Sequence, residues 1–109
     1  MSVITTHVLD TVLGRPAVGV GVRLERFDED LWLTIAESAT DAEGRCRNLD
    51  ANAPPGLYRL TFATGTYLKD QGRNTIYPKI LVTFRCGTEP HYHMPLLLSD
   101  NGYTTYRGS

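Results

Sequence analysis

Short runs in which apolar and polar side chains alternate constrain the fold of this chain more than any other feature. The alternation is clearest in residues 18–24, 31–36, 58–62 and 80–85. A period of two is typical of β-strands, whose successive side chains point to opposite faces of a sheet. Each run is short and rich in β-branched or aromatic residues, which favours a strand over a helix. We therefore expect a protein built mainly of β-sheet.

Turn-forming residues separate these runs at short intervals. They stand at residues 14–16, 28–30, 41–44, 54–56, 87 and 100–102. This punctuation by Gly, Pro, Asn and Asp leaves room for about seven or eight strands and predicts an antiparallel β-sandwich. Residues 66–72 differ, because they hold helix-forming residues and end on a glycine, so a short helix is expected there.

Length and composition favour one globular unit. The chain has 109 residues, with 41% hydrophobic and 21% charged residues, as in ordinary soluble domains. It has no internal repeat, low-complexity stretch or linker, so residues 1–109 are expected to form a single domain.

Charge and hydropathy argue against two classes of partner. The net charge is −1, and no basic stripe of the kind that binds nucleic acid is visible. No apolar run approaches the roughly 20 residues that cross a bilayer, so no membrane association is expected. No signal-peptide pattern is seen at the N-terminus, which predicts a cytoplasmic location. In that setting Cys46 and Cys86 are expected to be reduced and structural.

Candidate functional residues lie in three separate parts of the sequence: the first strand, one turn and the last segment. His7 shares a strand face with Thr5, and His91 and His93 share a face of a later strand. A single histidine on a strand is usually structural, but polar groups gathered near both ends of the chain favour a site. The candidates are His7, Arg45, His91, His93, Tyr106, Arg107, Gly108 and Ser109.

A metal site is the first alternative use of these histidines. A His-x-His pair on a strand and a third histidine could form a three-histidine zinc site. However, the neighbouring acidic residues resemble turn formers, and the sequence does not show whether the histidines converge. We therefore expect no metal and no cofactor.

Three motifs resemble the transthyretin-like family. ITTHVLDTVLGRPAVGVGVRL resembles the opening of that family, and TDAEGR resembles its conserved turn. The ending HYHMPLLLSDNGYTTYRGS resembles the hallmark of the 5-hydroxyisourate hydrolases, the enzymatic members of the family. The last four residues, YRGS, are the most specific element, because the hormone-carrying transthyretins lack them. The resemblance extends over nearly the whole chain.

This resemblance implies a transthyretin-like sandwich of two four-stranded antiparallel sheets with one short helix. It implies a homotetramer whose active sites lie at a dimer–dimer interface. It also implies a metal-free hydrolase of urate degradation, which opens the ring of 5-hydroxyisourate to 2-oxo-4-hydroxy-4-carboxy-5-ureidoimidazoline.

The resemblance also implies roles for the candidate residues. His7 and His93 would move protons, Arg45 would bind the substrate and stabilise an oxyanion, and Ser109 would hold substrate or water. Tyr106, Arg107, Gly108 and His91 would complete the binding site, with Arg107 either in the site or anchoring the tail to a carboxylate.

The chain departs from the family pattern at a few positions, and none of them removes a catalytic group. These are Glu43, Met94, Asp100, Asn101 and Thr104. Two other functions stay open: a transthyretin-like carrier that binds a small aromatic ligand without turnover, and a β-sandwich interaction module. Neither gives a reason for the polar groups near both ends of the chain and in one turn.

Overall fold

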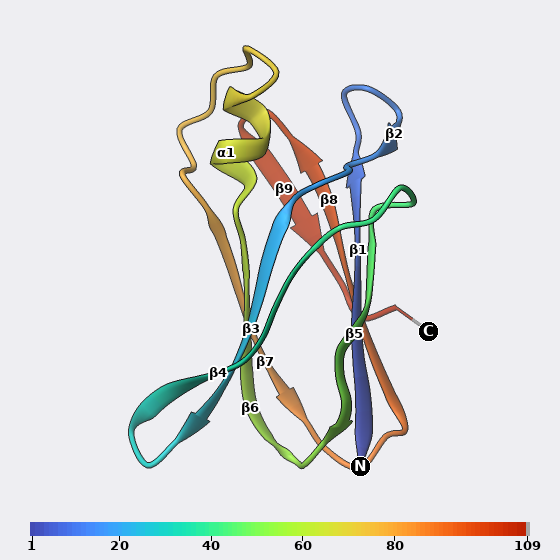
Figure 1. Ribbon diagram of the computed structural model, residues 1–109, viewed down its shortest axis with the longest axis vertical. Coiled ribbons are helices and arrows are strands. Elements are labelled where there is room, and N and C mark those ends of the chain that lie inside the picture. The colour runs from blue at the N-terminus through green and yellow to red at the C-terminus, as the bar shows by residue number, and fades with distance from the viewer. Residues whose placement is uncertain (109) are drawn as a thin grey trace.

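Two β-sheets pack face to face in the computed structural model, which describes residues 1–108 apart from the side chain of Asn48 (Figure 1). The helix lies at one end of the sandwich. In chain order, the elements are β1 (Ser2–Asp10), β2 (Arg15–Pro16), β3 (Gly21–Asp28), β4 (Leu31–Ala39), β5 (Arg45–Ala53), β6 (Gly56–Phe62), α1 (Thr64–Lys69), β7 (Ile80–Cys86), β8 (His91–Ser99) and β9 (Gly102–Thr105).

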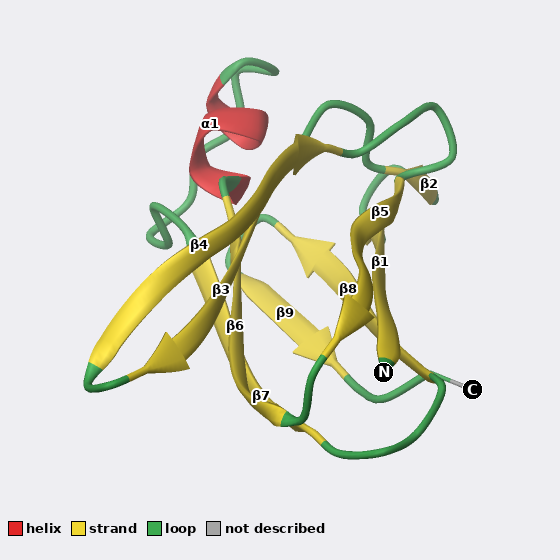
Figure 2. Ribbon diagram, turned by 60° about the horizontal axis from the view of Figure 1, so that its bottom comes forward, coloured by secondary structure: helices red, strands yellow, loops and turns green. Residues whose placement is uncertain are grey.

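The strands form two sheets as predicted, but one sheet has five strands where four were expected, and one pair of strands differs in direction. One sheet has the order β4-β3-β6-β7 and is antiparallel throughout. The other has the order β2-β1-β8-β9, and β5 pairs with β1 along the same edge as the two-residue β2 (Figure 2). Within it β1 and β8 run parallel, so the prediction of two purely antiparallel sheets is wrong at this pair. The two strands are far apart in the sequence, and nothing local to either one sets their relative direction.

The core lies between the two inward faces of the sheets. Along β1, buried and half-buried residues alternate without interruption, as the period of two predicted. Ile4 and Val8 of β1 face Leu24 and Leu60 of the opposite sheet region, and all four are fully buried. Burial of each such side chain is worth about 1.5–3 kcal/mol. Cys46 and Cys86 are buried in the same core and are not joined in a disulfide.

One strand and the helix have other bounds than the sequence predicted. The strand expected at residues 18–24 begins only at Gly21, because Gly19 adopts φ +79° in a turn. The helix expected at residues 66–72 covers Thr64–Lys69, and Gly72 with φ +69° ends the turn that follows it. No helix within residues 1–108 has the length and apolar character needed to span a membrane.

A buried ion pair between Asp10 and Arg73 stabilises the end of the sandwich where the helix lies. The Asp10 carboxylate accepts hydrogen bonds from Arg73 at 2.6 Å, from the Tyr67 hydroxyl at 2.8 Å and from the backbone N–H of Leu13 at 3.1 Å. Arg73 also binds Asp100 at 2.6 Å. Burial alone would raise the pKa of Asp10, but these donors hold it at about 2. The pair thereby links β1, the loop after α1 and the β8–β9 turn.

We expect Asp10→Asn to lower the free energy of unfolding by about 3 kcal/mol, because it leaves a largely buried Arg73 without one of its two carboxylates. Urea unfolding at pH 7 measures this, with the exposed Asp28→Asn as the control. A pKa lowered in the folded state means that the stabilisation is complete above pH 4 and is lost as the pH falls toward 2. The free energy of unfolding of Asp10→Asn should therefore fall less than that of the wild type as the pH drops from 4 toward 2. A loss below about 1 kcal/mol at pH 7 would contradict the anchoring role.

Candidate active site

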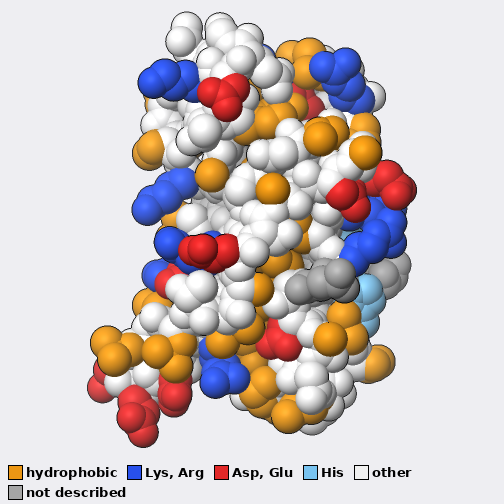
Figure 3. Space-filling model, viewed as in Figure 1, with side chains coloured by type: hydrophobic (Ala, Val, Ile, Leu, Met, Phe, Trp, Pro, Cys, Tyr) orange, Lys and Arg blue, Asp and Glu red, His pale blue; other side chains and the backbone are white. Residues whose placement is uncertain are grey.

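The parallel pairing of β1 and β8 brings the first of the candidate residues together. In this register Thr5 lies opposite His93, and Val3 lies opposite His91. Odd-numbered residues of both strands point away from the core, so the histidines share the outer face of one sheet with Thr5 and His7. Figure 3 shows histidine side chains at the surface on the side of the molecule where β1 and β5 lie, next to basic side chains.

A tight turn between β4 and β5 adds Arg45 to this face. Asp41 Oδ1 accepts hydrogen bonds from the backbone N–H groups of Glu43 at 2.8 Å and Arg45 at 3.0 Å, which lowers the pKa of the Asp41 carboxyl. Gly44 has φ +77°, and a Cβ there would lie 2.4 Å from the Val8 carbonyl oxygen, so the position requires glycine. The turn thus starts β5 with Arg45 directly opposite His7.

The same turn orients His7. His7 Nε2 lies 2.7 Å from the carbonyl oxygen of Glu43, which can only accept a hydrogen bond. Nε2 must therefore carry the proton, and in the neutral ring Nδ1 holds the free lone pair. Because only the backbone of Glu43 takes part, this contact does not depend on which side chain stands at position 43.

Thr5 joins the two histidines of β8. Its hydroxyl oxygen lies 2.7 Å from His91 Nε2 and 2.7 Å from His93 Nδ1. The ring centres of His91 and His93 are 6.0 Å apart, and those of His7 and His93 are 6.5 Å apart. Burial, followed by the positive charges of His91, Arg45 and His7, lowers the pKa of His93, so its ring is mainly neutral at pH 7.

Thr5, His91 and His93, but not His7, line a hollow of about 240 Å³ on the outer face of the sheet. Arg45 Nε is buried there and has no hydrogen-bond partner within the described residues, which leaves a donor for a bound molecule. Residues 1–108 hold no group of three His, Cys, Asp or Glu side chains arranged to bind a metal ion. The hollow is lined by Thr5, Thr6, Arg45, Arg47, His91 and His93.

The end of the described chain packs along β8 next to His93. The backbone N–H of Gly108 donates to the His93 carbonyl oxygen at 2.8 Å, which extends the antiparallel pairing of β9 with β8. Arg107 lies over the ring of Tyr92, with its Cζ 4.8 Å from the ring centre, and forms no ion pair with a carboxylate in the described part of the chain. Tyr106 is exposed, and Ser109 lies outside the described residues.

Gly108 is required by this close approach, because a Cβ on it would lie 2.7 Å from His93 Cδ2. We expect Gly108→Ala to push the tail off the His93 ring and to lower kcat/KM for the substrate about tenfold, since small displacements of catalytic groups are costly. Steady-state kinetics test this, with Gly56→Ala as the control, because Gly56 lacks a positive φ and the nearest atom to an added Cβ there would be Tyr58 Cε1 at 3.8 Å. An unchanged kcat/KM for Gly108→Ala would contradict the close packing.

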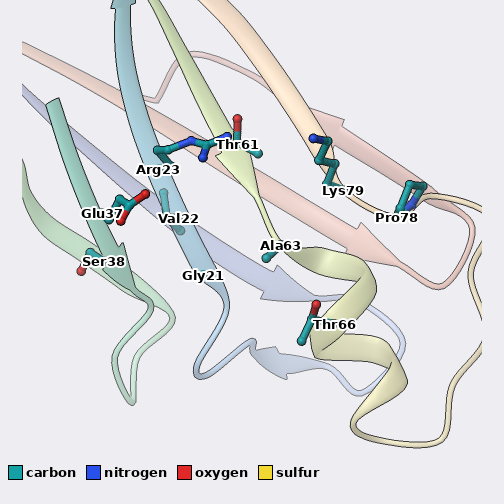
Figure 4. A pocket seen from close by; sticks show the side chains of 10 residues that line it. All are labelled: Gly21, Val22, Arg23, Glu37, Ser38, Thr61, Ala63, Thr66, Pro78 and Lys79. Atoms are coloured by element: carbon teal, nitrogen blue, oxygen red, sulfur yellow. The ribbon is translucent and has the colours of Figure 1, made fainter. Parts of the chain in front are cut away.

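A second and larger hollow lies on the other sheet, near α1 (Figure 4). Its volume is about 480 Å³, but it lacks a histidine or any other lining group that transfers protons near neutral pH. Arg23 and Glu37 are cross-strand neighbours on β3 and β4, and the Arg23 side chain points toward Thr61. The smaller hollow on the histidine face is therefore the better candidate for catalysis. The larger one is lined by Gly21, Val22, Arg23, Glu37, Ser38, Thr61, Ala63, Thr66, Pro78 and Lys79.

Comparison with known sequences now decides the family. The sequence model described as the HIUase/Transthyretin family matches residues 4–108. The chain belongs to this family. A 5-hydroxyisourate hydrolase of Caulobacter vibrioides is 44% identical to it over 115 residues, which cover 100% of both chains. The expected family and the two-sheet sandwich are both confirmed.

Solved structures of the family agree with the fold but do not separate its branches. The 5-hydroxyisourate hydrolase of Klebsiella pneumoniae is 39% identical, with a TM-score of 0.91 and full coverage of both chains. Transthyretin from Sparus aurata is 34% identical, with a TM-score of 0.93, and the match covers 99% of this chain and 97% of that one. Since both backbones fit equally well, the side chains of the site must distinguish an enzyme from a carrier.

Sequence reasoning grouped His7, Arg45 and the two late histidines, and the structure places all of them on one face. It did not assign a role to Thr5, although the alternation put Thr5 on the same face as His7. The two hydrogen bonds of Thr5 depend on the parallel register of β1 and β8, which has no signal in the sequence.

Proposed function

We propose that this protein is a 5-hydroxyisourate hydrolase, which opens the substrate ring by adding water to a cyclic amide in urate degradation. The observation that carries the proposal is the grouping of His7, Arg45 and His93 on one sheet face, where Arg45 and His93 line one hollow, in a chain 44% identical to a hydrolase. A carrier for an aromatic ligand has no use for two histidines and an arginine with an unpartnered donor.

Hydrolysis of a cyclic amide places three demands on the site. Water must lose a proton, the attacked carbonyl oxygen must be stabilised as it becomes negative, and the leaving nitrogen must gain a proton. The residues of this face provide one group for each demand.

His7 is the base in this proposal. Its Nε2 proton is held by the Glu43 carbonyl oxygen, so the lone pair of Nδ1 is free to take a proton from water. Histidine suits this step because its ordinary pKa is about 6.5, close to the working pH of most enzymes.

Arg45 binds the substrate and its developing oxyanion. The planar guanidinium presents several donors in one plane, which matches the carbonyl and imide edges of the flat ring. Because Nε is buried and has no partner among the described side chains and backbone groups, binding of the carbonyl oxygen would satisfy a donor that is otherwise desolvated.

His93 is the proton donor to the leaving nitrogen. Its ring centre lies 6.5 Å from that of His7, so both histidines can contact one substrate molecule bound on this face. Gly108 packs against its ring, and Tyr106 and Ser109 complete the binding site from the tail. Arg107 supports the tail through its contact with Tyr92.

Three wider properties belong to the same proposal. The chain acts as a single domain, and four copies assemble so that the open histidine face of one dimer meets that of another. The hollow is open on the outer side of the sheet, and a facing subunit would close it. The enzyme works in the cytoplasm and needs no metal.

The decisive test is turnover. 5-Hydroxyisourate would be generated in place from urate and urate oxidase, and its ultraviolet absorbance followed with and without the purified protein after treatment with a chelator. We expect decay well above the spontaneous rate, and it should survive the chelator. Decay at the spontaneous rate by a folded tetramer would refute the enzyme and favour a carrier, which tight binding of thyroxine, the ligand of the solved sea bream transthyretin complex, would then support.

A further inference from the structure

We infer that Thr5 is a positioning residue that relays a proton from His91 to His93, so that His93 can act as an acid while its own ring is neutral. The inference rests on the proposed hydrolase function and adds a residue and a proton path to it. Two observations support it. The His93 ring is mainly neutral, although an acid needs a proton to give, and the Thr5 hydroxyl lies within hydrogen-bond distance of both His91 and His93.

The conflict concerns the protonation of His93. Burial and three neighbouring positive groups lower its pKa, so at pH 7 the ring is mostly neutral. A neutral imidazole is a poor acid, because loss of its only N–H proton would leave an anionic ring. His93 can therefore protonate a leaving nitrogen only if a second proton reaches its other ring nitrogen during the same step.

The hydroxyl of Thr5 is placed to supply that second proton. It lies 2.7 Å from His93 Nδ1 and 2.7 Å from His91 Nε2, both within the normal range of a hydrogen bond. A hydroxyl has one hydrogen, so it donates to one of the two nitrogens and accepts from the other. With Thr5 donating to His93 Nδ1, His91 Nε2 carries a proton toward Thr5 and His93 Nε2 carries one toward the substrate.

The relay then balances in one concerted step. The N–H bond at His93 Nε2 breaks as its proton passes to the leaving nitrogen, and the Thr5 hydroxyl proton moves to His93 Nδ1. The Nε2 proton of a positively charged His91 moves to the Thr5 oxygen. His93 and Thr5 end neutral, His91 changes from cation to neutral ring, and the leaving nitrogen gains one proton.

His91 is suited to be the entry point for protons. It is exposed, whereas His93 is half-buried beneath the tail, so solvent can reprotonate His91 after each turnover. The other charged or titratable side chains that face this group are His7 on β1 and Arg45 and Arg47 on β5. None of them is an acid of the carboxyl type, so the relay has no competing carboxylate among the lining residues.

The closest alternative is that Thr5 only holds the two rings in place. Thr5→Val keeps the β-branched shape and removes the hydroxyl, and Thr5→Ser keeps the hydroxyl and removes a methyl group. The relay predicts that Thr5→Val lowers kcat at least about tenfold with little change in KM, and that Thr5→Ser restores most of it. Equal losses in both variants would indicate a packing role and overturn the inference.

A double-mutant cycle with His91→Gln separates the relay from independent effects. If the proton comes from His91, His91→Gln alone should lower kcat about as much as Thr5→Val, and it should add almost nothing in the Thr5→Val background. The His91 side chain is exposed, so His91→Gln is expected to fold even if Thr5→Val does not. An unchanged kcat in His91→Gln, or losses that add fully, would overturn the relay.

A measurement independent of turnover completes the test. NMR titration of the histidine rings in the intact protein should show that His93 responds in two steps in the wild type, because the bridge couples it to His91. In Thr5→Val, the titration of His93 should depend less on the protonation of His91. If the wild type lacks activity but shows the coupled titration, the proposed function fails and the bridge stands. If the wild type is active and the titrations are uncoupled in both proteins, the relay fails and the hydrolase stands.

Discussion

His7→Ala should lower kcat for 5-hydroxyisourate by about 10²–10⁴-fold, the usual contribution of a positioned general base, with a much smaller change in KM. The reason is geometric. The Glu43 carbonyl oxygen holds the Nε2 proton of His7 at 2.7 Å, which leaves Nδ1 as the lone pair that takes the proton of water. Steady-state rates at pH 7, measured with freshly generated substrate, give both constants.

His7→Gln is the matched control for this prediction. A glutamine amide nitrogen reaches about as far as Nε2 and can still donate to the Glu43 carbonyl oxygen, but it cannot accept a proton from water. If His7 acts as the base, glutamine should be as inactive as alanine. Recovery of most of the activity in His7→Gln would mean that His7 only holds the turn, and the base would have to be sought elsewhere.

Arg45→Met should lower kcat/KM by about 10²-fold, since loss of one oxyanion donor typically costs about 3 kcal/mol. Methionine keeps much of the stem but removes every donor. Arg45 Nε is buried without a partner in the described part of the chain, so this donor is left for a bound carbonyl oxygen. The same assay and a thermal unfolding curve separate lost catalysis from lost stability.

Arg45→Lys tests whether charge or shape matters at this position. Lysine retains the positive charge but lacks the planar fork of donors, so we expect it to recover only a small part of the loss. Arg85→Met, an exposed arginine on β7 of the other sheet, should leave kcat/KM unchanged. Full activity in Arg45→Lys would show that a general positive field is sufficient and would remove the oxyanion role.

The lowered pKa of His93 has a consequence for both experiments. A ring with its pKa below the ordinary value is mainly neutral at pH 7 and above, so the state of His93 should hardly change between pH 7 and 8. Differences between variants over that interval therefore reflect the substituted residue or another histidine. The turnover rates of the variants should be compared between pH 7 and 8.

Much of the architecture could be predicted because it is encoded locally. Alternation along β1 placed Thr5 and His7 on one face and Ile4 and Val8 in the core, since the period of a strand depends only on its own backbone. The turn at Asp41 and Gly44 was visible for the same reason, because a carboxylate that binds nearby N–H groups and a glycine with positive φ act within a few residues. The three motifs placed the chain in its family.

The sequence alone determined which residues are core, turn or candidate site, and only the tertiary structure decided how the candidates meet. The parallel register of β1 and β8 joins Thr5 to histidines more than eighty residues away, and the tail packs Gly108 on His93. Arg107 stacks on Tyr92 instead of pairing with a carboxylate in the described chain. Such contacts follow from the packing of strands distant in sequence, whose register is set by the shared core and leaves no local pattern to read.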